Sequence, residues 1–313
     1  MKHTGPRVEI TFPETLAGKY MAQVFANLLP AAEKDSAVEN EDEGSDSGIE
    51  ETGKEAGKET GKEAGKGNET PELVLHTPEK DIAECTRALM ERLEGSAPKW
   101  MVFVSGTDVY GTDEGTDIDE EKPLRPNTTE GRERARMEEE LRQWCHANGT
   151  TLTILRPATM FGTGMEGWAA EMFDDIMKGI YFHPREHNPR RSVVTAYDVA
   201  RVARALYNRG GVFNVTDGHE PTMRQLGDAM GSNAGKQKRP GTLPLKWLQF
   251  MARAGNNIGI LGRIIDSSKI EFRKRELTFD TSRLKEALPA DFTFFDTCEV
   301  LARKDCGYPY EEQ

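Results

Sequence analysis

Short apolar segments alternate along the chain with segments whose apolar residues recur at helical spacing. The strand-like segments are Arg7–Phe12 (RVEITF), Glu72–His76 (ELVLH), Trp100–Ser105 (WMVFVS) and Thr151–Leu155 (TLTIL). The same spacing analysis predicts helices at Leu16–Leu29, Asp81–Leu93 and Glu130–His146. Continuous apolar strands are typical of a parallel sheet that is buried on both faces. The alternation of strands with helices therefore predicts an α/β fold with right-handed crossovers and a doubly wound parallel sheet.

The pattern becomes irregular beyond about Gly162. Helices are predicted near Trp168–Met177, Ala196–Tyr207 and Met223–Met230, and a strand at Val212–Val215. We expect the sheet domain to comprise residues 1–33 and 71–162. Residues 163–313 are expected to form a smaller C-terminal α/β lobe, with some segments returning to the sheet.

The segment 34–70 differs from both parts in composition. It contains four tandem copies of E-[T/A]-G-K between Glu51 and Lys66, and it holds 12 acidic and 5 basic residues. A glycine at every fourth position costs a helix about 1 kcal/mol each, and large apolar residues are almost absent. We therefore expect a disordered, acidic, low-complexity insertion that acts as a solvated spacer.

Charge and cysteine usage exclude several classes of protein. A formal net charge of −12 over 313 residues argues against nucleic acid as a partner. The four cysteines are Cys85, Cys145, Cys298 and Cys306; they form no CxxC pair, which is typical of a reducing cytosol. His183 and His187 flank Pro184 without a carboxylate-rich motif, so we expect no metal site. No stretch of about 18 apolar residues is present, so we expect a cytoplasmic protein without a membrane segment.

Several segments, in order, resemble one family. They are 103–111 (FVSGTDVYG), 118–126 (IDEEKPLRP), 155–157 (LRP) with 161–162 (FG), 193–200 (VVTAYDVA) and 212–215 (VFNV). Their order and spacing resemble the extended short-chain dehydrogenase/reductases, the NAD-dependent epimerase/dehydratase family. The resemblance implies a Rossmann-like domain, NAD or NADP as cofactor and a nucleotide sugar as substrate.

The dinucleotide-binding turn expected from this resemblance is altered. The family places GxxGxxG after the first strand so that bare backbone approaches the pyrophosphate. The matching positions hold Phe12, Thr15 and Gly18. We expect Phe12 and Thr15 to obstruct the phosphates, and Gly18 to let the helix pack closely on the sheet. The acidic residue that would bind the adenosine ribose falls in the 34–70 insertion, where Asp35 or Glu39 could be nominated, so we expect a sheet that is reduced at one edge.

The catalytic set that the resemblance implies is also replaced. The Ser/Thr, Tyr and Lys positions of the family correspond to Gly106, Glu130 and Arg134. Glu130 cannot imitate a phenol, because an exposed carboxyl titrates near about pH 4. We expect it to cap a helix together with Asn127, and Arg134 to pair with Glu138 at i,i+4 spacing.

The hydroxyls that remain near these positions belong to Ser105, Thr107 and Tyr110. Tyr110 is a candidate for a displaced acid/base, although the family uses this position to line the pocket. Ser105 and Pro157, together with Phe12, Thr15 and Gly18, contact a cofactor only if a site survives.

Three functions remain open. The first is a non-catalytic binding or assembly subunit without NAD(P), which forms a homodimer or pairs with a related enzyme through the helix at 130–146. The alternative is an active NAD(P)-dependent enzyme that acts on a nucleotide sugar with a rebuilt site. The third, a hydrolase or lyase, lacks a nucleophile and base at suitable spacing. Arg190 and Arg191 lie where relatives often place a basic residue facing the sugar-nucleotide phosphates, although we expect a solvated pair.

Overall fold

A five-stranded parallel sheet forms the centre of the protein in a computed structural model that describes residues 7–25, 70–233, 239–255 and 267–303. Its strand order is β1-β2-β3-β5-β9, and every neighbouring pair is parallel. The strands are β1 (Val8–Thr11), β2 (Leu73–His76), β3 (Trp100–Val104), β5 (Thr151–Pro157) and β9 (Gly211–Val215). The predicted α/β fold with a Rossmann-like parallel sheet is therefore confirmed.

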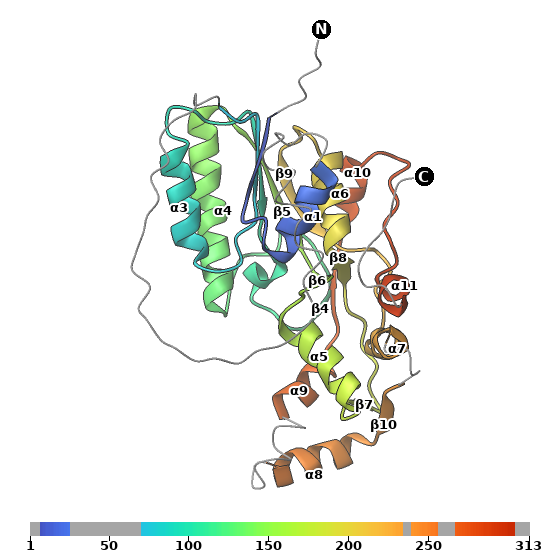
Figure 1. Ribbon diagram of the computed structural model, residues 1–313. Coiled ribbons are helices and arrows are strands. Elements are labelled where there is room, and N and C mark those ends of the chain that lie inside the picture. The colour runs from blue at the N-terminus through green and yellow to red at the C-terminus, as the bar shows by residue number, and fades with distance from the viewer. Residues whose placement is uncertain (1–6, 26–69, 234–238, 256–266, 304–313) are drawn as a thin grey trace, which may run out of the picture.

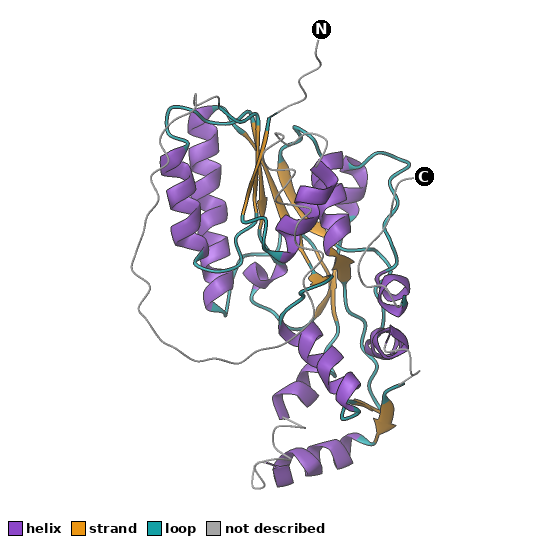
Figure 2. Ribbon diagram, viewed as in Figure 1, coloured by secondary structure: helices purple, strands orange, loops and turns teal. Residues whose placement is uncertain are grey.

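Helices cover both faces of this sheet (Figures 1 and 2). Those packed on it are α1 (Leu16–Phe25), α3 (Ile82–Arg92), α4 (Thr129–Asn148), α6 (Ala196–Ala205) and α10 (Ser282–Ala287). Helices α3 and α4 lie side by side on one face, whereas α1, α6 and α10 lie on the other. Residues 26–29 of the first predicted helix lie outside the described residues.

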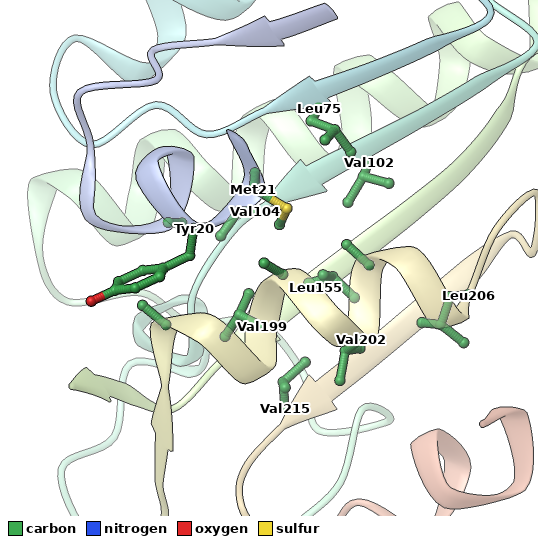
Figure 3. Close-up of a cluster of buried hydrophobic side chains, with 14 of the residues drawn as sticks. Tyr20, Met21, Leu75, Val102, Val104, Leu155, Val199, Val202, Leu206 and Val215 are labelled. Carbon is green, nitrogen blue, oxygen red and sulfur yellow. The ribbon is translucent and has the colours of Figure 1, made fainter. Parts of the chain in front are cut away.

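The central strands are apolar throughout because successive side chains point to opposite faces of the sheet and both faces are buried. All five residues of β3 are buried. Val102 packs in the cluster beneath α1 and α6, with Met21 and Leu155 (Figure 3). Its neighbour Phe103 packs on the other face in the cluster beneath α3 and α4.

The first strand lies at one edge of the sheet. β1 pairs with β2, and in the described ranges no strand pairs with its other side. In a doubly wound sheet the strand that carries the phosphate-binding turn normally lies inside the sheet, with further strands beyond it. Within the described ranges the sheet therefore ends at β1. The insertion predicted at 34–70 lies outside the described residues, except for Thr70, and remains a prediction.

The other elements form short two-stranded pairs and a second group of helices below the sheet in Figure 1. The paired strands are β4 (Gly115–Ile118) with β11 (Leu277–Phe279), β6 (Thr159–Phe161) with β8 (Val193–Thr195), and β7 (Phe182–Pro184) with β10 (Gly241–Leu243). The helices are α5 (Gly167–Lys178), α7 (Met223–Asn233), α8 (Leu245–Gly255), α9 (Ser267–Phe272) and α11 (Thr297–Ala302), and the 3₁₀ turn η1 (Thr107–Tyr110) follows β3. None of the described helices is long and apolar enough to cross a bilayer.

Candidate functional site

The turn between β1 and α1 occupies the dinucleotide position and is closed by its own hydrogen bonds. Phe12 has a φ of 61°, the left-handed conformation that glycine adopts without strain. The Thr15 hydroxyl lies 2.9 Å from the Phe12 carbonyl, to which it donates, and it accepts the Gly18 N–H at 3.1 Å. A Cβ on Gly18 would lie 2.1 Å from the Phe12 carbonyl oxygen, so Gly18 permits this close packing.

A carboxylate lies at the start of α1, where a pyrophosphate would lie in a dinucleotide-binding protein. Glu79, which follows β2, accepts the Leu16 N–H at 2.8 Å through Oε1. Burial raises the pKa of Glu79 above its usual value against the effect of that hydrogen bond, and the negative charge of Glu166 raises it further. The sequence analysis missed Glu79, although its position just beyond the carboxyl end of β2 was a usable signal.

The three catalytic positions hold no acid/base pair. Glu130 is exposed at the start of α4, and Arg134 Nη1 bonds Asp108 Oδ2 at 2.5 Å. A Cβ on Gly106 would lie 2.7 Å from Asp108 Oδ1, so the Asp108 side chain takes the space of a Ser or Thr at that position. The predicted pairing of Arg134 with Glu138 is wrong, because Glu138 is fully buried and faces other partners.

Those partners form a buried polar network at the carboxyl ends of β3 and β5, the edge of the sheet at which folds of this kind bind ligands in a crevice. Glu138 accepts hydrogen bonds from Ser105 at 2.7 Å and from Arg156 at 2.6 and 3.0 Å. Arg156 also donates to the Tyr110 hydroxyl at 3.1 Å, which in turn donates to Asn214 Oδ1 at 2.6 Å. Burial raises the pKa of Tyr110. Ser105 and Tyr110 are therefore committed to the core, and Tyr110 is unsuited to acid/base work.

Two further predictions for this region concern Pro157 and the cap of α4. Pro157 is buried at the end of β5, where it pairs with Val215. The cap of α4 is Thr128, whose hydroxyl accepts the Gly131 N–H at 3.0 Å. The predicted cap formed by Asn127 is therefore wrong, because the helix begins one residue later than such a cap requires.

These residues do not fit NAD or NADP. A dinucleotide requires bare backbone at this turn, whereas Phe12 carries a ring, which lies 5.8 Å from the His76 ring. The N–H groups of Leu16 and Gly18 at the start of the helix already have acceptors. Asp35 and Glu39, the nominated ribose ligands, lie outside the described residues.

A second hollow, of about 300 Å³, lies in the C-terminal lobe. Its lining residues are Asp113, Trp168, Glu171, Met172, Asp175, Tyr181, Met223, Lys269, Phe272 and Arg273. The volume is at the lower end of the range for small-molecule sites. The aromatic and apolar side chains among these residues provide surfaces on which a planar ring could stack.

Two buried arginines pack on aromatic rings that line this hollow. The Arg273 guanidinium lies 4.1 Å from the centre of the Tyr181 ring, and the Arg191 guanidinium lies 3.9 Å from that of Phe272. Arg191 is only 3% exposed, so the predicted solvated pair is wrong for Arg191, whereas Arg190 is exposed and bonds Glu220 and Glu276. Burial lowers the pKa of Arg191 to about 10.

Several buried polar atoms of Tyr181, which lines the hollow, and of three residues outside its lining lack a hydrogen-bond partner among the described residues. They are Tyr181 Oη, His183 Nε2, Arg191 Nε and Arg224 Nε. A buried polar group without a partner is costly, and a ligand is one way to satisfy it. Arg273 Nη1 donates to the Phe182 carbonyl at 3.2 Å, whereas its Nη2 lies 3.7 Å from Asp175, which is too long for a hydrogen bond and leaves that end of the guanidinium for a stronger acceptor.

A further hollow of about 320 Å³ lies between α4, β5 and β9, lined by Cys145 and Thr150 among others. It is at the amino ends of these strands, because Leu152 and Gly211 lie near their beginnings. Ligand sites of parallel sheets lie at the carboxyl ends. The hollow in the C-terminal lobe is therefore the better candidate.

The parallel sheet, with a helix starting after its first strand, defines an α/β protein with a Rossmann-like fold. Residues 69–216 match the family described as "NAD dependent epimerase/dehydratase family". This match confirms the resemblance found in the motifs of that segment. Comparison with curated proteins found no match.

Solved structures show the same fold over nearly the whole chain. UDP-N-acetylglucosamine 4-epimerase from Bacillus cereus is 14% identical, with a TM-score of 0.62 over 96% of this chain and 98% of that one. The UDP-N-acetylglucosamine 4-epimerase from Methanobrevibacter ruminantium M1 in complex with UDP-N-acetylmuramic acid is 14% identical, with a TM-score of 0.64 over 96% and 97%. RMD from Pseudomonas aeruginosa complexed with NADPH is 15% identical, with a TM-score of 0.62 over 96% and 97%. At these identities the likeness concerns the fold alone.

Proposed function

We propose that this protein is a catalytically silent member of its family that binds a sugar nucleotide, or its nucleoside diphosphate part, without NAD(P). One observation carries the proposal: the catalytic positions hold Gly106, exposed Glu130 and Arg134, and Arg134 is bonded to Asp108. Gly106 has no side chain and a guanidinium has no acceptor atom, so the Ser/Thr hydroxyl, the Tyr phenol and the Lys amine of the family have no counterpart at these positions.

The ligand class is supported by the hollow in the C-terminal lobe. Guanidinium groups match phosphate oxygens in geometry and charge, and Arg191 and Arg273 provide two of them beside aromatic rings. Lys269 bonds Glu171 at 2.9 Å, but the Glu171 side chain is 59% exposed, so this pair is weak and a diphosphate can compete for the lysine. Structural neighbours solved with UDP-N-acetylmuramic acid, and with UDP-glucose together with NAD, support the sugar-nucleotide class.

A thermal-shift titration tests both parts of the proposal. A ligand present at about 100 times its dissociation constant adds about 2.7 kcal/mol of stability. We expect UDP and UDP-glucose to raise the melting temperature, and NAD⁺ and NADP⁺ to leave it unchanged. A clear shift with NAD⁺ or NADP⁺, or epimerisation of a UDP-sugar followed by NMR, would contradict the proposal and favour an active enzyme.

The same proposal includes an assembly role in the cytoplasm, as a homodimer or with a related enzyme. Helices α3 and α4 cover one face of the sheet side by side, which leaves their outer surface for association (Figure 1). We expect a mass measurement in solution to give a dimer at micromolar concentration. A monomer that also fails to bind any related enzyme would exclude the assembly role while leaving ligand binding testable.

A further inference from the structure

The Glu79 carboxylate accepts a hydrogen bond from the N–H of Leu16, the first residue of α1. A helix N-terminus attracts anions because its first N–H groups lack intrahelical acceptors and its dipole is positive there. Glu79 takes the Leu16 N–H at 2.8 Å and the Thr15 hydroxyl takes the Gly18 N–H at 3.1 Å. Both donors, which a pyrophosphate would need, are therefore used by the chain itself.

From this arrangement we propose that Glu79 is a built-in anion that excludes dinucleotides from the crevice. The inference rests on the proposed function, and it assigns the loss of NAD(P) binding to charge at Glu79 as well as to the shape of Phe12. A neutral obstruction and a fixed negative charge predict different behaviour when each is removed, so the two causes can be separated.

Charge in the crevice favours exclusion. The charges that act on Glu79 come from Glu166 before α5, Arg134 of α4 and the adjacent Lys80. Arg134 is already paired with Asp108 at 2.5 Å. A pyrophosphate would bring two more negative charges close to the Glu79 and Glu166 carboxylates, and like charges at short range repel more strongly in a partly buried site than in water.

The obstruction by shape can be removed without disturbing the turn. Phe12 adopts a φ of 61°, which a glycine accommodates more readily than a phenylalanine. Phe12→Gly should therefore fold, with the lost ring contact to His76 partly offset by the relaxed backbone. Glu79→Gln removes the charge and keeps an oxygen that can accept the Leu16 N–H.

The experiment is an isothermal titration of NAD⁺ into wild type, F12G, F12G/E79Q and F12G/E91Q. Glu91 is an exposed carboxylate of α3, so F12G/E91Q makes the same change of net charge away from the crevice. We expect F12G/E79Q to bind NAD⁺ at least about tenfold more tightly than F12G/E91Q, because a repulsive charge is removed from the position of the phosphates. Equal affinities, including two proteins that do not bind, would overturn the inference.

A second measurement needs only F12G, in case the double variant does not fold. Burial and the charge of Glu166 raise the pKa of Glu79, so its charge is lost earlier on acidification than that of an ordinary glutamate. We expect F12G to bind NAD⁺ more tightly as the pH falls from about 7 to about 5, and pH-independent binding would overturn the inference. Ordinary affinity of the wild type for NAD⁺ would instead contradict the proposed function, so the two failures are distinguishable.

Discussion

The crevice at the start of α1 and the hollow in the C-terminal lobe differ in how their polar groups are satisfied. In the crevice, Glu79, Thr15 and Glu138 accept the hydrogen bonds of the helix N–H groups and of Arg156, and the atoms there without a partner among the described residues, Asp108 Oδ1 and Arg134 Nε, belong to one ion pair. Around the hollow, Tyr181 Oη and Arg191 Nε lack partners among the described residues. The difference teaches that polar side chains in the first region support the fold, whereas those in the second leave binding capacity for a ligand.

The largest effect is expected at Glu138. Glu138→Ala leaves the Arg156 guanidinium, 2% exposed, without its carboxylate. Breaking a buried pair from one side costs about 3–5 kcal/mol of unfolding free energy, measured by urea denaturation. Its exposed neighbour provides the control, because Glu139→Ala should change stability by less than about 0.5 kcal/mol. A small loss in Glu138→Ala would show that the network does not hold the crevice together.

Acidification should destabilise both regions through histidines that are buried in the neutral form. Burial lowers the pKa of His76 to about 3 and that of His183 to about 4. The unfolded chain takes up these protons below about pH 6.5 while the folded protein does not, so stability is complete above that pH and falls below it. At about pH 5 each histidine should cost about 2 kcal/mol.

Carboxyl groups with raised pKa values, such as Asp198 and Asp217, act in the opposite direction. The test is therefore the difference between wild type and His76→Gln or His183→Gln at each pH, in which the contributions of the carboxyls cancel. A wild-type curve parallel to that of His76→Gln between about pH 7 and 5 would contradict the prediction.

Thr15→Val should have a smaller effect within the closed crevice. The substitution keeps the shape of the side chain but removes the hydroxyl that serves the Phe12 carbonyl and the Gly18 N–H. We expect a loss of about 1–2 kcal/mol in unfolding free energy. Thr116→Val, at an exposed position of β4, is the matched control and should be nearly neutral.

Arg191→Met should have the smallest effect on stability and a clear effect on binding. Burial lowers the pKa of Arg191 to about 10, which means that the fold penalises its charge. We expect a change in stability below about 1 kcal/mol and UDP affinity at least about tenfold weaker. Arg190→Met should leave UDP binding unchanged. A loss of several kcal/mol in Arg191→Met would remove the contrast between the two regions.

The sequence predicted the elements of the sheet well because periodicity reports burial directly. Trp100–Val104 is apolar throughout and is buried on both faces. Phe12, Thr15 and Gly18 were also placed correctly at the turn, because a strand followed by a helix fixes their position. Predictions of element type therefore held, whereas the cap by Asn127 and the pairing of Arg134 with Glu138 did not.

Pairings across the fold could not be obtained in this way. Arg134 and Glu138 have ideal helical spacing, yet Glu138 turns inward to Arg156 and Arg134 turns to Asp108. Glu79 meets Leu16 across 63 positions of sequence, which no local pattern records. Arg191 was predicted to be solvated together with Arg190, because no local sequence pattern indicates that its guanidinium packs on the Phe272 ring.

The position of β1 at the sheet edge has a consequence for the length of the chain. β1 pairs with β2, with Val8 beside Leu73. The chain that follows Phe25 therefore needs only to lead back to the start of β2. The entropy of closing such a connection grows with the logarithm of its length, and doubling it costs about 0.6 kcal/mol. For the insertion that the sequence predicts, we therefore expect that adding or removing one copy of the E-[T/A]-G-K unit changes the stability of the domain by less than about 0.6 kcal/mol.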